Sequence, residues 1–263
     1  MNIPFAKYHG AGNDFVIFNG IDLRAFVLTE KQIIKICDRR FGIGADGILI
    51  LKNHVDYDFR MTYFNADGSR GSFCGNGGRC IVAFIHQLGL IKEKTCFIAD
   101  DGIHHARVIQ KDWIELKMCD VTDIQPVLDG HYLHTGTEHY VEIVSELTEV
   151  NVDKRGKELR FNSTFKPNGT NVNYVKIAND QLDIRTYEKG VEAETLACGT
   201  GAIAAVIVAI QKENKIGSSQ YKVNARGGQL EVRVHYNGVQ FTDIWLCGGA
   251  AFVFKGTYEF PFP

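Results

Sequence analysis

The segment Cys198-Gly199-Thr200-Gly201 opens the most apolar stretch of the chain, AIAAVIVAIQK at 202–212. An earlier segment, Cys74-Gly75-Asn76-Gly77, has the same Cys-Gly-x-Gly form and leads into a second apolar stretch, RCIVAFIHQLG at 79–89. The two cysteines are 124 residues apart, close to half of the 263 residues of the chain. A glycine-flanked cysteine before an apolar stretch, found twice at this spacing, indicates an internal repeat.

The agreement between the two halves extends beyond these segments. Eleven residues before each cysteine lies the tyrosine of a Thr-Tyr pair, Tyr63 in the first half and Tyr187 in the second. Each apolar stretch is followed by an alternating run, a turn and a second run, which read HHARVIQ-KD-WIELKM and LEVRVHY-NG-VQFTDIW. Asn237-Gly238 is typical of a hairpin with a two-residue turn. We therefore interpret the chain as two pseudo-symmetric halves.

Local patterns predict the elements of each half. Thr29 and Gln32 form a capping-box pair at the start of a helix predicted over 29–39. A second helix is predicted over 75–87, closed by Gly89, and a third over 199–212, which is apolar on nearly every face and so must be buried. Short runs rich in Val, Ile, Tyr, Phe and Thr predict strands: FRMTYF, LRFNSTF, NVNYVKIA, LDIRTYE and YKVNA. The predicted fold class is α+β, with strands wrapped around a central helix in each half.

Composition excludes several functional classes. The chain carries 29 Lys and Arg against 31 Asp and Glu, with no basic run, which argues against a nucleic-acid or anionic-membrane surface. Its longest apolar run, at 202–210, has nine residues, too short to cross a bilayer. The N-terminal sequence shows no secretory signal, and an odd count of seven cysteines favours reduced thiols in the cytoplasm.

The two Cys-Gly turns suggest acid–base chemistry. A thiol at a helix N-terminus lies beside unpaired N–H groups and the positive end of the helix dipole, which stabilise a thiolate and bind a carboxylate. Two such turns suit an inversion in which one thiolate removes a proton from carbon and the other thiol donates one to the opposite face. The remaining cysteines are expected to serve packing: Cys37, Cys80, Cys96, Cys119 and Cys247.

Other motifs give weaker signals. The segment Gly42–Gly47 matches G-x-G-x-x-G but follows a helix, so we interpret it as a turn. His131, His134 and His139 lack metal-ligand spacing; we expect the first two, like the pair His104-His105, to be surface residues. A cysteine hydrolase would leave the second Cys-Gly turn unexplained. A zinc- or redox-binding thiol protein remains the alternative from another class.

The chain closely resembles the diaminopimelate epimerase family. The resemblance rests on six segments in the family's order: GAGNDF at 10–15, RRFGIGADG at 39–47, YFNADGS at 63–69, CGNGGRC at 74–80, TNVNY at 170–174 and YEKGVEAETLACGTG at 187–201. It implies epimerisation of LL- to meso-diaminopimelate, for lysine and peptidoglycan synthesis, without PLP, another cofactor or a metal. It also implies two β-barrel-like domains, 1–119 joined by the strand at 248–263, and 120–247, with the active site in the cleft between them.

The same resemblance assigns roles to residues. Cys74 and Cys198 are implied to be the two acid–base thiols, and His139 and Glu188 to tune them. The implied substrate-binding residues comprise the cradle of the α-carboxylate and the groups that fix the ammonium and the distal end: Gly75, Asn76, Gly199 and Thr200, then Asn13, Asn65, Asn173, Glu188 and Lys189.

Three positions depart from the family pattern. Lys189 stands where an arginine is usual, Thr137 where an asparagine is common, and Gly47 where some members have glutamine. Lysine keeps the charge but loses bidentate geometry. The nearest alternative is therefore a related racemase of another amino acid. In either case the expected partner is a small-molecule amino acid, with no nucleic acid and no membrane; a homodimer is compatible with the sequence.

Overall fold

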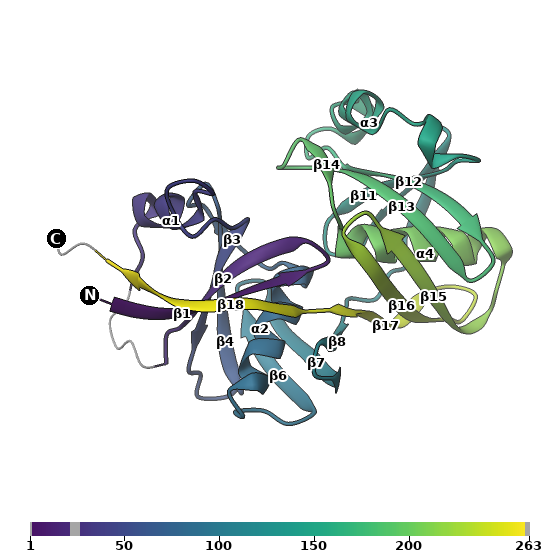
Figure 1. Cartoon of the computed structure of the whole chain (residues 1–263). Helices are drawn as coiled ribbons and strands as arrows, with labels where there is room; N and C mark the ends of the chain where they lie inside the picture. Colours follow the sequence, from purple (N-terminus) through teal and green to yellow (C-terminus); the bar gives the residue numbers. More distant parts are fainter. Residues whose placement is uncertain (1, 22–26, 261–263) are drawn as a thin grey trace. The chain divides into compact units, whose positions relative to one another are not determined.

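The computed structural model describes residues 2–21 and 27–260. The outer ends of the predicted domain ranges, at 1 and 261–263, therefore lie outside the described residues. The chain divides into two compact units, Met1–Leu116 with Gly248–Pro263, and Lys117–Cys247 (Figure 1). No helix in the described ranges is long and apolar enough to cross a membrane.

The described residues of the N-terminal unit form two helices and the strands of one continuous ladder. The helices are α1 (Glu30–Cys37) and α2 (Gly75–Gln87). The strands are β1 (Asn2–Gly10), β2 (Asn13–Asn19), β3 (Gly47–Lys52), β4 (Phe59–Asn65), β5 (Arg70–Gly71), β6 (Lys94–Ala99), β7 (Gly102–Gln110), β8 (Trp113–Lys117) and β18 (Ala251–Glu259). Pairing alternates along the ladder: β1–β2 antiparallel, β2–β3 parallel, β3–β4 antiparallel, β4–β6 parallel and β6–β7 antiparallel.

The C-terminal unit repeats this ladder with its own elements. Its helices are α3 (Val152–Arg160) and α4 (Gly199–Glu213), with 3₁₀ turns at Leu147–Glu149 and Ser163–Phe165. Its strands are β9 (Ile124–Val127), β10 (Gly130–His134), β11 (Glu138–Ile143), β12 (Asn171–Ala178), β13 (Gln181–Glu188), β14 (Ala193–Thr195), β15 (Gly217–Ala225), β16 (Gly228–Tyr236) and β17 (Phe241–Gly249). The pairs β10–β11, β11–β12, β12–β13, β13–β15 and β15–β16 follow the same antiparallel and parallel sequence. The predicted α+β class and the two pseudo-symmetric halves are confirmed.

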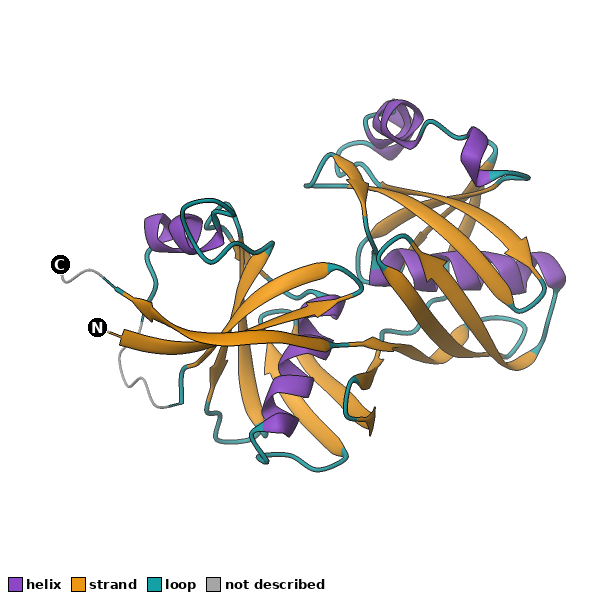
Figure 2. Cartoon of the chain, in the orientation of Figure 1, coloured by secondary structure: helices purple, strands orange, loops and turns teal. Residues whose placement is uncertain are grey.

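A central helix fills the core of each unit. Helix α2 packs against β1, β2, β3, β4 and β7, and helix α4 packs against β10, β11, β12, β13 and β16 (Figure 2). Every residue of the apolar run 202–210 in α4 is at most 1% exposed, as its all-round apolar sequence predicts. Helix α2 ends as predicted, because Gly89 adopts the left-handed backbone (φ 74°) that ends helices.

Helix α1 confirms the predicted capping box. The Thr29 side chain accepts from the Gln32 backbone N–H, while the Gln32 side chain accepts from the Thr29 N–H. Ile33, Ile36 and Cys37 then turn inward onto β2 and β3. Local capping together with an apolar stripe was sufficient to define this element.

Two local predictions are wrong. LRFNSTF at 159–165 is not a strand: Asn151 caps α3 by accepting from Lys154 N, and Asn162 caps the following 3₁₀ turn by accepting from Thr164 N. These side-chain caps outweigh the β preference of Phe and Thr. The Asn237 turn is also longer than predicted, with four residues, because Asn237 Oδ1 accepts from both Val239 N and Gln240 N.

Candidate active site

Cys74 and Cys198 occupy the N-cap positions of α2 and α4. Both have extended backbones, and neither side chain caps its own helix. Each cysteine carbonyl accepts the first helical hydrogen bond, from Gly78 N at 2.7 Å and from Ala202 N at 3.0 Å. The backbone N–H groups that precede Gly78 in α2 and Ala202 in α4 therefore have no acceptor within the helix. They point out of the helix N-terminus, beside a half-buried thiol. Each unit thus holds a half-site that pairs a thiol with backbone donors suited to a carboxylate.

In the N-terminal half-site, the thiol of Cys74 faces an amide oxygen. Cys74 Sγ lies 3.6 Å from Asn13 Oδ1, which also accepts from Asn76 Nδ2 at 3.2 Å. The other end of the amide, Asn13 Nδ2, donates to Asp46 Oδ2 at 2.7 Å. Because an ionised carboxylate only accepts, Asp46 fixes the amide with its oxygen toward the sulfur. The neutral thiol of Cys74 can therefore donate to a preset acceptor.

Asp46 belongs to a network of alternating charges. Arg39 bridges Asp14 and Asp46 at 2.8 and 2.6 Å, and Lys7 pairs with Asp14 at 2.7 Å and donates to the Gly44 carbonyl. Burial would raise the pKa of Asp14, but hydrogen bonds from Arg39 and Lys7 outweigh it and lower the pKa to about 2. The segment 42–46 is a loop, as predicted, and it delivers Asp46 to the site. Sequence reasoning missed Asp46, although it lies inside the RRFGIGADG segment.

Asn76 is hydrogen-bonded to a buried arginine that the sequence analysis also missed. Arg79 is fully buried in the first turns of α2 and donates to Asn76 Oδ1 at 2.7 Å and to the Gly75 carbonyl at 3.4 Å. With its oxygen occupied, Asn76 directs its Nδ2 to Asn13. The i, i+3 spacing within GNGGR was the available signal.

The C-terminal half-site places a hydroxyl beside its thiol. Cys198 Sγ lies 3.5 Å from Thr200 Oγ1. His139 Nε2 lies 2.9 Å from the same oxygen and 3.0 Å from Thr137 Oγ1. His139 is fully buried, and this burial, with His134 next in effect, lowers its pKa to about 3. The imidazole is therefore neutral near pH 7.

Two asparagines of β12, Asn173 and Asn171, make different contacts next to this half-site. Asn173 is fully buried, and its amide contacts Thr186, Tyr140 and His139. Those protein partners occupy the groups that the sequence analysis expected to bind substrate.

Asn171 was missed by sequence reasoning. Its Oδ1 accepts from the Lys189 backbone N–H at 2.9 Å, and its Nδ2 donates to Thr137 Oγ1 and the Glu138 carbonyl at 3.2 and 2.8 Å. Asn171 thus connects the end of β13 with Thr137 and Glu138 at the start of β11. The TNVNY segment contains both asparagines, and nothing in it distinguishes them.

The predicted distal residues lie at strand ends. Asn65 ends β4, where it accepts from Tyr63 Oη at 2.5 Å and donates to Ser69 Oγ at 3.0 Å. Glu188 ends β13, and Lys189 follows it. The ammonium of Lys189 pairs with Glu138 at 2.6 Å. Burial would raise the pKa of Glu138, but the hydrogen bond from Lys189 outweighs it and lowers that pKa. The charge that stands in place of the usual arginine is therefore already paired.

The remaining thiols are only partly what the sequence predicts. Cys37, Cys80 and Cys247 are buried, as packing residues should be. Cys119 is exposed and Cys96 is half-buried, so the packing prediction is wrong for Cys119 and incomplete for Cys96. Cys119 follows the end of β8, outside any strand, and Cys96 occupies one of the less buried positions of β6, where burial alternates along the strand.

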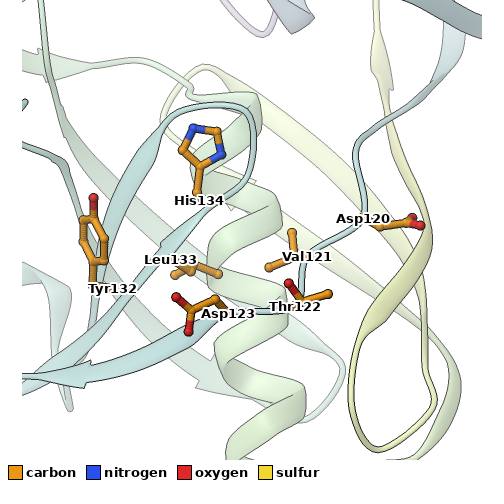
Figure 3. Close-up of a pocket in the computed structure, with 7 residues that line it drawn as sticks. All are labelled: Asp120, Val121, Thr122, Asp123, Tyr132, Leu133 and His134. Carbon is orange, nitrogen blue, oxygen red and sulfur yellow. The ribbon is translucent and has the colours of Figure 1, made fainter.

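The histidines other than His139, and a pocket in the described residues, lie outside the set of predicted site residues. Within residues 2–21 and 27–260, no three His, Cys, Asp or Glu side chains gather as metal ligands. His104 was expected to be a surface residue, and this prediction is wrong, because its ring stacks on Phe73 with the centroids 3.9 Å apart. A pocket of about 250 Å³ in the C-terminal unit contains His134 (Figure 3). Its lining residues are Asp120, Val121, Thr122, Asp123, Tyr132, Leu133 and His134, and none is a predicted site residue.

Solved structures of known proteins share this fold. A phenazine biosynthesis protein of the PhzF family from Bacillus anthracis has a TM-score of 0.77 at 15% identity and covers 99% of this chain and 100% of its own. A probable proline racemase from Agrobacterium radiobacter has a TM-score of 0.71 at 13% identity, covering 98% of this chain and 93% of its own. At these identities the likeness establishes the fold alone.

Sequence relatives identify the family. The profile of the diaminopimelate epimerase family matches residues 5–118 and 131–252. A diaminopimelate epimerase of Flavobacterium psychrophilum is 44% identical over 95% of this chain and 98% of its own length. One from Chlorobaculum tepidum is 40% identical over 94% of this chain and 98% of its own. Matches of this extent, together with a cysteine at the start of each central helix, show that the chain is an isomerase of the diaminopimelate epimerase family.

Proposed function

We propose that this chain interconverts LL- and meso-diaminopimelate, with Cys74 and Cys198 acting on opposite faces of one α-carbon. The observation that carries the proposal is the pair of half-sites, each with a thiol at the N-cap of a central helix. Family membership and relatives named diaminopimelate epimerase support the substrate. The product would serve lysine and peptidoglycan synthesis.

The reaction is an inversion by proton exchange. One cysteine thiolate removes the α-proton, and the electron pair left on carbon delocalises into the α-carboxylate. In this proposal, N–H groups at the starts of α2 and α4, around Gly75-Asn76 and Gly199-Thr200, would stabilise the extra charge on that carboxylate. The second cysteine, as a thiol, donates a proton to the opposite face. The enzyme then returns to its starting state by exchanging protons with water.

The two thiol environments suit opposite protonation states. Asn13 Oδ1 can only accept, so it favours the neutral thiol of Cys74. The Thr200 hydroxyl can donate, so it can stabilise the thiolate of Cys198. In the free enzyme we therefore assign the base to Cys198 and the acid to Cys74.

The distal end of the substrate needs its own donors and acceptors, because diaminopimelate carries a second amino-acid group. We propose that Asn65, Glu188 and Lys189 contribute to this subsite. Lys189 differs from an arginine fork because it offers a point charge, and Glu138 competes for that charge.

Deuterium exchange tests the substrate. Purified protein with reductant is incubated in D₂O with LL-diaminopimelate and a panel of L-amino acids, and α-deuteration is followed by NMR. We expect exchange on diaminopimelate with conversion to the meso form. Faster exchange on another amino acid would replace this substrate by that of a related racemase.

Cysteine variants test the two-base chemistry. Cys74→Ser and Cys198→Ser should each reduce racemisation by about 10²–10⁴-fold, the usual contribution of a general acid or base. Cys119→Ser, which changes an exposed thiol, is the matched control and should retain activity. Full activity of either site variant would contradict the proposal. Stoichiometric zinc in the reduced wild-type protein, measured by elemental analysis, would instead favour a metal-binding thiol protein.

A reducing compartment, which we propose to be the cytoplasm, suits this chemistry. No disulfide joins the seven cysteines, all of which lie within the described ranges. Oxidation of a catalytic thiol would remove its proton-transfer capacity, so the enzyme needs surroundings that keep thiols reduced.

A further inference from the structure

The amide of Asn173 is fixed in one orientation by three protein groups. Its Oδ1 accepts from Thr186 Oγ1 at 2.9 Å, and its Nδ2 donates to the Tyr140 carbonyl at 3.0 Å. A carbonyl oxygen only accepts, so the NH₂ end of the amide must lie on the Tyr140 side. The opposite orientation would place two oxygens against each other at Tyr140 in a fully buried position, at a large cost in free energy.

This orientation determines the tautomer of His139. Asn173 Nδ2 lies 3.0 Å from His139 Nδ1, and its second N–H points there as a donor. Nδ1 must then accept with its lone pair, so the neutral ring carries its proton on Nε2. Burial keeps the imidazole neutral by lowering its pKa, with His134, Glu138 and Lys189 as the charged or titratable groups around it.

The tautomer in turn determines what the neighbouring hydroxyl can do. The Nε2–H of His139 lies between Thr200 Oγ1 at 2.9 Å and Thr137 Oγ1 at 3.0 Å, and it donates to these oxygens. Thr200 is therefore not required to donate to the imidazole. Its own proton can point to Cys198 Sγ, 3.5 Å away.

We propose that Asn173 is a positioning residue that, through the tautomer of His139, makes the Thr200 hydroxyl a hydrogen-bond donor to the Cys198 thiolate. The inference rests on the proposed function, in which Cys198 exchanges a proton with substrate. It gives Asn173 a role in preparing the base rather than in holding the substrate. The chain of hydrogen bonds runs from Thr186 through Asn173, His139 and Thr200, each donating to the next, and it ends on the Cys198 thiolate as acceptor.

Asn173→Asp reverses the hydrogen bond between this residue and His139. A carboxylate at this position accepts from His139 Nδ1–H, so the Nε2 lone pair competes for the Thr200 proton. In protein labelled with ¹⁵N-histidine, we expect the wild-type His139 to show a protonated Nε2 and the variant to show a protonated Nδ1. The His139→Gln variant assigns the signal among the nine histidines. A wild-type His139 protonated on Nδ1 would overturn the proposal.

Alkylation of Cys198 measures the consequence without substrate. The pH profile of iodoacetamide labelling, read at Cys198 by mass spectrometry, should shift upward by about one pH unit in Asn173→Asp and in Thr200→Val, as expected for loss of one hydrogen bond to an ionised group. Thr200→Ser should restore the wild-type profile. Asn151→Asp is the matched control, because Asp also caps α3 and lies at an exposed position of the same unit.

The outcomes separate the two proposals. An unchanged Cys198 profile in either Asn173→Asp or Thr200→Val, in a folded variant, would overturn the positioning role, whatever the activity. A shifted profile in a protein that exchanges no α-proton on any amino acid would leave the positioning role in place and overturn the proposed function. A folded state comparable with the wild type, shown by circular dichroism, is required of each variant, and Thr200→Val supplies the test where Asn173→Asp fails to fold.

Discussion

The two half-sites have the same backbone arrangement, a cysteine at the N-terminus of a central helix, but they differ in the side chains that face their thiols. Around Cys74, an amide oxygen is fixed by a network of charges in which Asp46, Asp14 and Arg39 alternate. Beside Cys198, the Thr200 hydroxyl is hydrogen-bonded to His139, which belongs to a group of neutral, buried side chains. The half-site of Cys74 depends on ionised groups near the surface, and the half-site of Cys198 depends on the tautomer of a buried histidine.

This difference shows what the repeat does and does not impose. The repeated ladder and central helix fix the position of each cysteine and of the N–H groups beside it. The protonation state depends on side chains from other strands, which the repeat does not copy. An inversion with two bases needs this division, because at any moment one thiol must be charged and the other neutral.

The strongest test of the comparison replaces equivalent glycines. In Gly201→Ala, the new Cβ would lie 2.4 Å from Asn173 Oδ1, an atom held by Thr186; in Gly77→Ala it would lie 3.2 Å from the tip of Leu49. We expect Gly201→Ala to lose about 1–3 kcal/mol of unfolding free energy, typical of overpacking, and about 100-fold or more in kcat, equal to about 2.7 kcal/mol.

Gly77→Ala is the matched control for this prediction. The leucine tip can move, and alanine favours a helix over glycine by about 1 kcal/mol, so stability should change little. Urea denaturation and initial rates measure both variants. Equal losses in the two would show that the halves tolerate the change alike and would contradict the difference described here.

Acid should affect the two halves at different pH values. The pKa of His139 is lowered to about 3, so between pH 6.5 and 3 the unfolded chain binds a proton that the folded chain does not. Stability is therefore complete above pH 6.5 and falls as pH decreases, by about 1.4 kcal/mol per pH unit at most. His139→Gln should flatten this dependence in urea titrations.

In the N-terminal unit the pKa shift has the same direction, but it acts in a more acidic range. The pKa of Asp14 is lowered to about 2, so its contribution is present above its unfolded value of 3.8 and is lost as pH falls toward 2. Hydrogen exchange at about pH 5 should therefore open the amides around His139 before those around Asp14. The reverse order would contradict the assignment of neutral and charged networks to the two halves.

Releasing the amide of Asn13 should weaken the N-terminal half-site. In Asp46→Asn, the new side chain can donate as well as accept, so the Asn13 amide can turn its NH₂ group toward Cys74. We expect kcat to fall about tenfold, or about 1.4 kcal/mol, with a smaller change in KM. Asp100→Asn, which loosens Arg60 and Arg70 in the same unit, is the control and should keep its kcat.

The smallest effects are expected at the distal ion pair. Partly exposed pairs contribute about 0–1 kcal/mol, so Glu138→Gln should barely change stability. It should, however, release Lys189 and lower KM for a substrate with a second carboxylate. Lys189→Met should raise KM. Steady-state kinetics with both variants tests whether Lys189 binds the distal carboxylate. If KM changed in the same direction in the two variants, Lys189 would not belong to the distal subsite.

The sequence could predict features that short segments determine. The Thr29 capping box, the Gly89 stop and the fully buried α4 each depend on residues within one helix or next to it. The two cysteines could be located because the repeat placed them at equivalent positions. Where side-chain caps acted instead, as at Asn162, the β preference of nearby residues was misleading.

Features set by strand register could not be predicted. Asn171 and Asn173 are two residues apart and so share one face of β12. What separates them is the pairing: Asn171 lies opposite His139 on β11, while Asn173 lies opposite Thr186 on β13. Asp46 is likewise defined by a bond to Asn13, 33 residues earlier. Such contacts depend on how distant segments align, which no local pattern encodes.

The pairing of β1 with β18 has a consequence for the order in which the protein is made. Strand β1 begins at Asn2, and its partner runs to Glu259, so β1 waits for a strand that is synthesised much later. The unit Lys117–Cys247 is continuous in the chain and can complete its core while the ribosome is still translating. Vectorial synthesis therefore favours completion of the unit that carries the buried His139 before that of the unit that carries Asp46. One side of the chemistry is assembled during translation, and the other is finished only when the closing strand emerges.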